Sequence, residues 1–189
     1  MTIAIAASAC SVDGLPTADT TVRQVDDLGN RLPFATKHSR RWNSGNNGSS
    51  YEPCTALASV DLDNLGVDPD SAKDAAGTNG QTLRGCEWKY KGRTDRTLSQ
   101  FVGNSVSLAH AQSRRSDRSD VWQPKLRIGT RTVGVHINTT GGQCDTYVQS
   151  RGAGVITMVF EFSDPPSPTT DICERAIAFT RATIDRMPE

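Results

Sequence analysis

Apolar and polar residues alternate along the middle of the chain, a pattern that predicts β-strands with one buried face. The clearest example is the segment 86–91, in which Cys86, Trp88 and Tyr90 alternate with charged residues. A less regular alternation at 102–108 predicts a second strand. We therefore expect Trp88 to lie in the core, on the inward face of its strand.

Three more strands follow, and glycine-containing turns at 138–142 and 152–154 separate them. The alternating positions in these strands are Val133, Val135 and Ile137, then Cys144, Thr146 and Val148, then Ile156, Met158, Phe160 and Phe162. Strands joined by tight turns pair antiparallel, so this part of the chain predicts a meander.

Helices are predicted on both sides of these strands. Apolar residues at helical spacing predict a helix over 54–65, with Pro53 at its entry and Gly66 at its end. A shorter helix is expected over 68–77 and a final helix over 170–187. This arrangement indicates an α+β fold, in which a twisted antiparallel sheet of about five strands carries an N-terminal and a C-terminal helix on one face.

The balance of charge argues against one large class of function. The 189 residues contain 21 Lys plus Arg and 21 Asp plus Glu, so the formal net charge is zero. A general nucleic-acid binder needs a surplus of basic side chains to neutralise phosphates, and we expect no nucleic acid among the partners. No stretch approaches the roughly 18 consecutive apolar residues of a membrane-spanning helix.

The first fifty residues differ in composition from the rest. The apolar, uncharged stretch 1–9 resembles the end of a secretory signal, and Ala7-Ser8-Ala9-Cys10 resembles a bacterial lipobox. We interpret 1–9 as the remnant of a signal peptide, Cys10 as a lipidated N-terminus, and 10–50, rich in Thr, Asp, Gly, Ser and Asn, as a flexible tether. The alternative is a short frayed tail in which Cys10 is incidental. Residues 51–189 then form a single disulfide-stapled α+β domain.

Four cysteines, Cys54, Cys86, Cys144 and Cys173, are spread over this domain, and none lies at the spacing of a zinc site. Four such cysteines in a small domain fit two disulfides and an oxidising compartment. Pairing 54–86 and 144–173 would join each helix to the sheet, and we favour it. Four cysteines permit three pairings, so the other two remain open.

Several short motifs occur in a fixed order between residues 50 and 189. They are Pro53-Cys54-x-x-Leu57, Leu62-x-x-Leu65-Gly66, Gly85-Cys86-x-Trp88, Cys144 at the start of a strand, Asp171-x-Cys173-x-x-Ala176 and the terminal Met187-Pro188. This order and spacing resemble the actinobacterial putative lipoproteins grouped as domain of unknown function 3558. The resemblance implies an envelope lipoprotein, in agreement with Cys10 as an anchor, and it brings no catalytic residues.

We find no motif that carries catalysis or metal binding. The chain contains no H-E-x-x-H, G-x-S-x-G or G-x-x-x-x-G-K pattern. If the four cysteines of the domain are bridged, they leave no thiol nucleophile there. We therefore expect no catalytic residue, no metal and no cofactor.

The outer face of the sheet is the candidate contact surface. The side chains expected on it are Asp145, Glu161, Lys89, His136, Tyr147 and Gln149. This polar face can bind a small molecule, or it is the ordinary wet side of a half-covered sheet. His136 is expected to point to solvent. Trp122, in a polar loop over 111–125, is expected to be a contact anchor or to pack on the domain.

We interpret the protein as a secreted cell-envelope lipoprotein with a non-catalytic binding domain on the outer side of the membrane. Its partners would be the membrane, through Cys10, and an envelope protein or small apolar ligand. The alternatives are an envelope-acting hydrolase whose carboxylates the sequence does not place, and a structural subunit of an envelope complex. Two carboxylates converging in a cavity would favour the hydrolase. An apolar patch near Trp122 would favour a protein partner. An open apolar cleft would favour a lipid or a small ligand.

Overall fold

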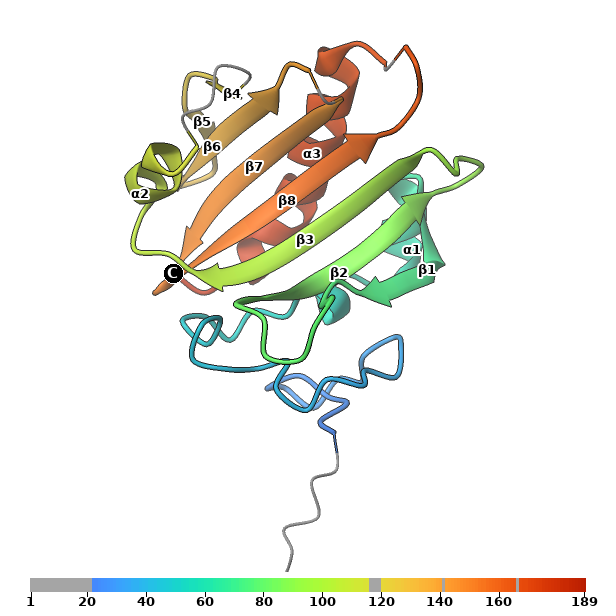
Figure 1. The fold of residues 1–189 in the computed structure, drawn as a ribbon, viewed down its shortest axis with the longest axis vertical. Helices are drawn as coiled ribbons and strands as arrows, with labels where there is room; N and C mark the ends of the chain where they lie inside the picture. Colours follow the sequence, from blue (N-terminus) through green and yellow to red (C-terminus); the bar gives the residue numbers. More distant parts are fainter. Residues whose placement is uncertain (1–21, 116–119, 141, 166) are drawn as a thin grey trace, which may run out of the picture.

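The computed structural model describes residues 22–115, 120–140, 142–165 and 167–189. These residues form an antiparallel sheet of eight strands in the order β1-β2-β3-β8-β7-β6-β4, with β5 paired to β6 (Figure 1). The strands are β1 (Val67–Asp74), β2 (Leu83–Tyr90), β3 (Arg96–Asn104), β4 (Asp120–Trp122), β5 (Leu126–Ile128), β6 (Arg131–Asn138), β7 (Gln143–Ser150) and β8 (Ala153–Glu161). Sequence analysis predicted the antiparallel meander, which β6, β7 and β8 confirm.

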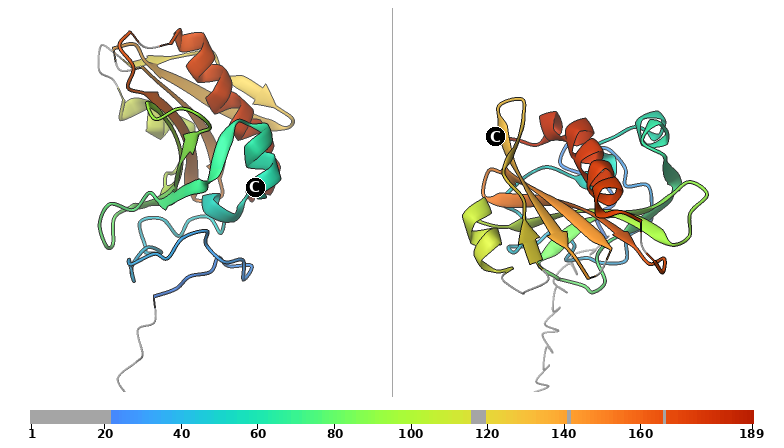
Figure 2. Two further views of the ribbon diagram at one scale, coloured as in Figure 1. Left: turned by 90° about the vertical axis from the view of Figure 1, so that its right-hand side faces the viewer. Right: turned by 90° about the horizontal axis from the view of Figure 1, so that it is seen from above.

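The helices lie on two sides of this sheet (Figure 2). They are α1 (Ser59–Asn64), α2 (Leu108–Ser113) and α3 (Thr169–Thr183), with the 3-10 turns η1 (Pro53–Thr55) and η2 (Ile184–Arg186). The C-terminal helix α3 packs on β7 and β8, whereas α2 lies on the opposite side of the sheet, beside β6 and β7. We call the sheet face opposite α3 the open face, because α2 covers only one end of it.

The core lies between the sheet and α3. Trp88 is 2% exposed, as its alternation predicts, and its ring centroid lies 5.5 Å from that of Phe179 on α3. Leu98 and Val159, paired across β3 and β8, are completely buried on the same face. Burying such a side chain contributes about 1.5–3 kcal/mol, so this layer holds the helix on the sheet.

The sheet has eight strands where about five were predicted, and the difference lies at its edges. The segment 68–77, expected to be helical, belongs largely to β1, in which Val67 is the one fully buried side chain. An edge strand needs only one hydrogen-bonded neighbour and can stay polar, so apolar alternation does not mark it. Similarly, the polar loop expected over 111–125 contains the end of α2 and the short strand β4. The helix predicted over 54–65 is divided into η1 and α1.

Residues 22–50, expected to be a flexible tether, are packed against the domain in the structure (Figure 1). Arg41 and Asn46 are 1% and 0% exposed. The Asn46 amide donates to the carbonyl of Arg41 at 2.9 Å, and the Asn43 amide donates to that of Gln81 at 2.8 Å. The polar side chains of this segment therefore form hydrogen bonds that hold it on the domain, as buried polar groups generally do. Cys10 and the rest of 1–21 lie outside the described residues.

The four domain cysteines form one disulfide, not two. Cys144 on β7 and Cys173 on α3 are joined, with their Cα atoms 5.1 Å apart, as the favoured pairing predicts. Cys54 and Cys86 are buried free thiols that contact each other. The prediction of a second bridge differs from the structure, in which the Cys54 thiol donates instead to the carbonyl of Gly85 at 3.2 Å.

Candidate functional site: the open face of the sheet

An apolar stripe runs along β8 on the open face. We define it as Ile156, Met158, Phe160 and Phe162. The first three are half-buried and alternate with residues that point toward α3, and Phe162, just beyond the strand, is 66% exposed. The rings of Phe160 and Phe162 lie edge to face with centroids 4.4 Å apart. Within the described residues no helix covers this stripe, so it stays accessible to solvent (Figure 1).

A pocket of about 470 Å³ opens at the Ile156 end of the stripe. Leu83 on β2 and Ile156 supply apolar walls, and Tyr147 on β7 supplies an aromatic one. His110 on α2, with Arg114 and Arg115 just after it, supplies a basic rim. Of the described residues that line this pocket, none is acidic. Its volume is in the range of sites for small molecules.

Glycine shapes the floor of this pocket. A Cβ atom on Gly154 would lie only 2.4 Å from the ring of Tyr147, so the ring can lie against β8 only because residue 154 has no side chain. The Tyr147 hydroxyl donates to Gln149 Oε1 at 2.6 Å and lies 3.0 Å from Ser105 Oγ. Burial raises the pKa of Tyr147, which keeps this wall neutral. The ring is therefore fixed in place before any ligand arrives.

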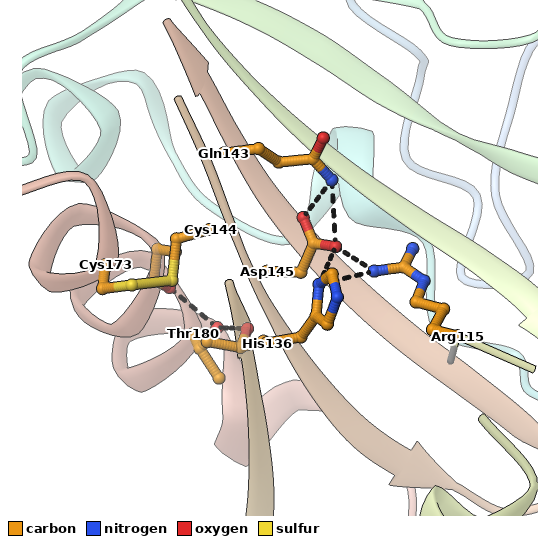
Figure 3. The surroundings of a disulfide bond; sticks show 9 residues. Arg115, His136, Gln143, Cys144, Asp145, Cys173 and Thr180 are labelled. Carbon is orange, nitrogen blue, oxygen red and sulfur yellow. Dashed lines mark hydrogen bonds and ion pairs between the residues drawn. A yellow bond between two sulfur atoms is a disulfide. The ribbon is translucent and has the colours of Figure 1, made fainter. Parts of the chain in front are cut away.

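A buried ionic cluster lies beside the pocket, on the face of β7 opposite the disulfide (Figure 3). His136 Nε2 lies 2.9 Å from Asp120 Oδ1, and His136 Nδ1 lies 3.2 Å from Asp145 Oδ2 and 3.1 Å from Arg115 Nη1. Arg115 also forms an ion pair with Asp145, and the amide of Gln143 donates to both Asp145 oxygens at 3.0 and 3.1 Å. The cluster therefore ties Arg115, at the rim, to the sheet.

The charge balance of the cluster is set by Asp145, which is 2% exposed. Burial alone would raise the pKa of Asp145, but the hydrogen bond with His136 and the charge of Arg115 outweigh it and lower the pKa. Asp145 is therefore an anion that neutralises part of the charge of Arg115. The two carboxylates that converge on His136 are Asp120 and Asp145, and neither lines the pocket.

Some of the predicted surface residues do lie together on the open face. The structure places Asp145, His136, Tyr147 and Gln149 there, on β6 and β7. His136 does not point to free solvent as predicted, because the Trp122 ring packs on it at 5.0 Å between centroids and leaves it 2% exposed. Trp122 is half-buried on β4, and its Nε1 has no hydrogen-bond partner among the described residues.

Of the two other predicted members of this surface, Lys89 lies on the open face but away from the pocket, and Glu161 lies on the other face. Glu161 pairs in register with Arg96 and lies on the face toward α3. The two side chains form a buried ion pair. Burial opposes ionisation, but hydrogen bonds from Ser163 and Arg96 lower the pKa of Glu161 to about 2. Lys89 lies on β2, separated from β7 by β3 and β8. Glu161 and Asp145 therefore do not form a carboxylate pair.

Sequence reasoning missed the basic rim, because 111–125 was expected to be a polar loop. The signal that marks α2 is Ser107, whose side chain accepts a hydrogen bond from the backbone N–H of His110 at 3.1 Å. Serine at this position before a short helix is a recognised N-cap. The helix then directs His110 and Arg114 toward the pocket.

The described residues contain no group of three or more His, Cys, Asp or Glu side chains arranged to hold a metal ion. None of their helices is long and apolar enough to cross a membrane. What the open face offers chemically is a basic rim, an aromatic wall and an adjoining apolar stripe. Such a surface can bind an elongated molecule whose two ends differ in polarity.

A family model described as "Protein of unknown function (DUF3558)" matches residues 5–186. Comparison with curated proteins gave no match, and comparison with solved structures gave none.

Proposed function

The chain belongs to the DUF3558 family of proteins of unknown function, and we propose that it is a cell-envelope lipoprotein whose domain binds a small ligand on the open face of its sheet without catalysing a reaction. One observation carries the proposal: a pocket of about 470 Å³ adjoins an uncovered apolar stripe on the side of the sheet that α3 leaves free. Exposed apolar surface of this kind generally marks a binding site.

The arrangement of side chains supports binding over catalysis. A general acid or base must reach the substrate, and His136 is 2% exposed with both ring nitrogens within 3.2 Å of a carboxylate oxygen. Asp145 is similarly enclosed by its ion pair with Arg115. The aromatic and basic side chains that do reach the pocket are Tyr147, His110, Arg114 and Arg115. They are suited to holding a ligand, and no described carboxylate reaches the pocket to pair with His110.

The test is non-denaturing mass spectrometry of the full-length protein released from its own envelope with mild detergent. We expect a bound compound on the wild type and a loss of that compound in Leu83→Glu, because Leu83 lines the pocket and is 37% exposed. Val60→Glu is the matched control, since Val60 is 62% exposed on α1, away from the pocket. A wild type without any compound, or a Leu83→Glu variant that keeps it, would refute the proposal.

The anchor is proposed separately, at Cys10. It rests on the small residues before this cysteine and on its isolation from the four cysteines of the domain. A peptide mass map of the envelope-extracted gene product tests it. The proposal predicts an N-terminal peptide that begins at Cys10 and carries acyl chains. An unmodified Cys10 within a longer peptide would contradict the anchor but leave the binding proposal intact.

A further inference from the structure

The pocket and the apolar stripe differ in chemistry, and they are continuous. Ile156 belongs to both, since it lines the pocket and begins the stripe. In the register of the sheet, Ile156 lies between Phe101 on β3 and Tyr147 on β7. From Ile156 to Phe160 the strand extends by about 13 Å, which is enough for a row of apolar contacts along a chain-like molecule.

The basic rim has charge to spare. Arg115 is engaged by Asp145, but Arg114 is exposed and forms no ion pair or side-chain hydrogen bond with any described residue. His110 is also exposed at the rim. No described residue lining the pocket is acidic, so the described side chains that an anion would meet at the rim are cationic or neutral.

We propose that the open face binds an anionic amphiphile, a molecule with a phosphate or carboxylate head and a linear apolar tail. The head lies at Arg114 and His110, and the tail lies along Ile156, Met158 and Phe160. This inference rests on the proposed function, because it names the class of ligand for the same site. A flat protein surface fits less well, because the basic groups are at the mouth of a pocket of about 470 Å³ and not along a plane.

The position of Arg115 supports the same assignment. Its guanidinium is held by Asp145 and lies 3.1 Å from His136 Nδ1, so it keeps one orientation at the rim. A preorganised donor loses less conformational entropy when an anion binds than a free side chain does. The buried cluster therefore positions Arg115, while Arg114 supplies a charge that no described residue neutralises.

The experiment is calorimetric titration of the full-length protein with dodecyl phosphate below its micelle concentration. Dodecanoate, butyl phosphate, inorganic phosphate and dodecyltrimethylammonium serve as the other probes. We expect dodecyl phosphate or dodecanoate to bind at least about tenfold more tightly than butyl phosphate, and higher ionic strength to weaken this binding. Tighter binding of the cationic probe, or equal binding of inorganic phosphate, would overturn the assignment.

Two substitutions separate head from tail. Arg114→Ala is expected to weaken dodecyl phosphate binding about tenfold, because a charge-assisted hydrogen bond is lost. Arg181→Ala, on the exposed side of α3, is the matched control and should bind as the wild type does. Met158→Gln should reduce the difference in affinity between dodecyl phosphate and butyl phosphate, since it places an amide in the apolar stripe. Equal affinities of Arg114→Ala and the wild type would contradict the proposed head site.

The two levels of proposal fail in different ways. If mass spectrometry finds a neutral or cationic compound that Leu83→Glu loses, the open face is a binding site and the amphiphile assignment is wrong. If no compound is found and dodecyl phosphate does not bind, both proposals fail. If folding of Met158→Gln is impaired in thermal unfolding, the chain-length series on the wild type still decides the tail site.

Discussion

Arg41 holds Glu52 through two hydrogen bonds of 2.7 and 2.8 Å, and their side chains are 0% and 2% exposed. Glu52 also accepts from Arg84 at 3.0 Å, and Arg41 donates to Asp74 at 3.0 Å. This ion cluster joins the N-terminal segment 22–50 to the sheet. The polar composition of the segment does not show that Arg41 is buried in such a cluster, because a flexible tether has the same composition. The segment is therefore part of the domain that carries the open face.

Glu52→Gln tests this attachment. The substitution leaves the buried Arg84 without its carboxylate partner and Arg41 with Asp74 alone, so we expect the free energy of unfolding to fall by about 3–5 kcal/mol. Asp27→Asn is the control, because it breaks the solvent-exposed pair with Arg23 and should cost less than about 1 kcal/mol. Urea unfolding of the two variants measures both. Equal stability of Glu52→Gln and the wild type would show that the cluster does not hold the segment.

The parts of the fold that sequence reasoning found are strands with one face buried under α3 and the other face less covered. Trp88 lies under α3, and its strand alternates because only that face is buried. The strand expected over 102–108 is displaced, because β3 spans Arg96–Asn104 and Leu108 begins α2. The edge strand β1 shows no such alternation and was missed. Alternation correctly put His136 opposite Val135, but it could not show that Trp122 covers His136, because that contact depends on how β4 returns to β6.

The disulfide between Cys144 and Cys173 is expected to stabilise the domain by about 3.5 kcal/mol, since it closes a loop across a sequence separation of 29 residues. Cys173→Ser should therefore lower the melting temperature markedly. Cys10→Ser should leave it unchanged, because Cys10 is outside this loop. Calorimetry on the oxidised variants gives the comparison, and equal melting temperatures for both would contradict the assigned roles.

Cys54 and Cys86 provide a direct thiol count. Burial and the contact with Cys86 raise the pKa of Cys54 well above its usual range, and burial raises that of Cys86, so both thiols should react slowly with iodoacetamide in the native state. In guanidinium without reductant, mass spectrometry should find both alkylated and the Cys144–Cys173 bridge intact. If both remain unalkylated after unfolding, the two are bridged and the structure shows only their reduced form.

Acid should destabilise the protein through Glu161. Its pKa in the folded state is about 2, against an ordinary value of 4.5, so its contribution is present above about pH 4.5 and is lost as the pH falls toward 2. The pKa of Glu52 is also lowered and adds in the same direction. Glu161→Gln should therefore show a shallower loss of unfolding free energy between pH 5 and pH 2, measured by urea titration. Identical pH dependence in the wild type would contradict the assigned pKa.

Two glycines near the pocket allow a matched pair of substitutions. Gly154→Ala places a Cβ 2.4 Å from the Tyr147 ring, so the ring must move and we expect a loss of about 1–3 kcal/mol. Gly152→Ala places a Cβ in ordinary contact, 3.6 Å from Gly48, and should be tolerated. Thermal unfolding compares the two, and the fluorescence of Tyr147 and its neighbours reports the displaced ring. Equal effects would show that the ring does not depend on the missing side chain.

The most direct test of the open face as the ligand site uses the methionines. Met158 lies on the apolar stripe, whereas Met187 is 3% exposed in the core beside η2. With the methionine methyl groups carbon-13 labelled, dodecyl phosphate or the envelope-derived compound should shift the Met158 methyl signal and leave that of Met187 in place. A Met158 signal that stays in place at saturating ligand, or that moves no more than Met187, would contradict binding at this face.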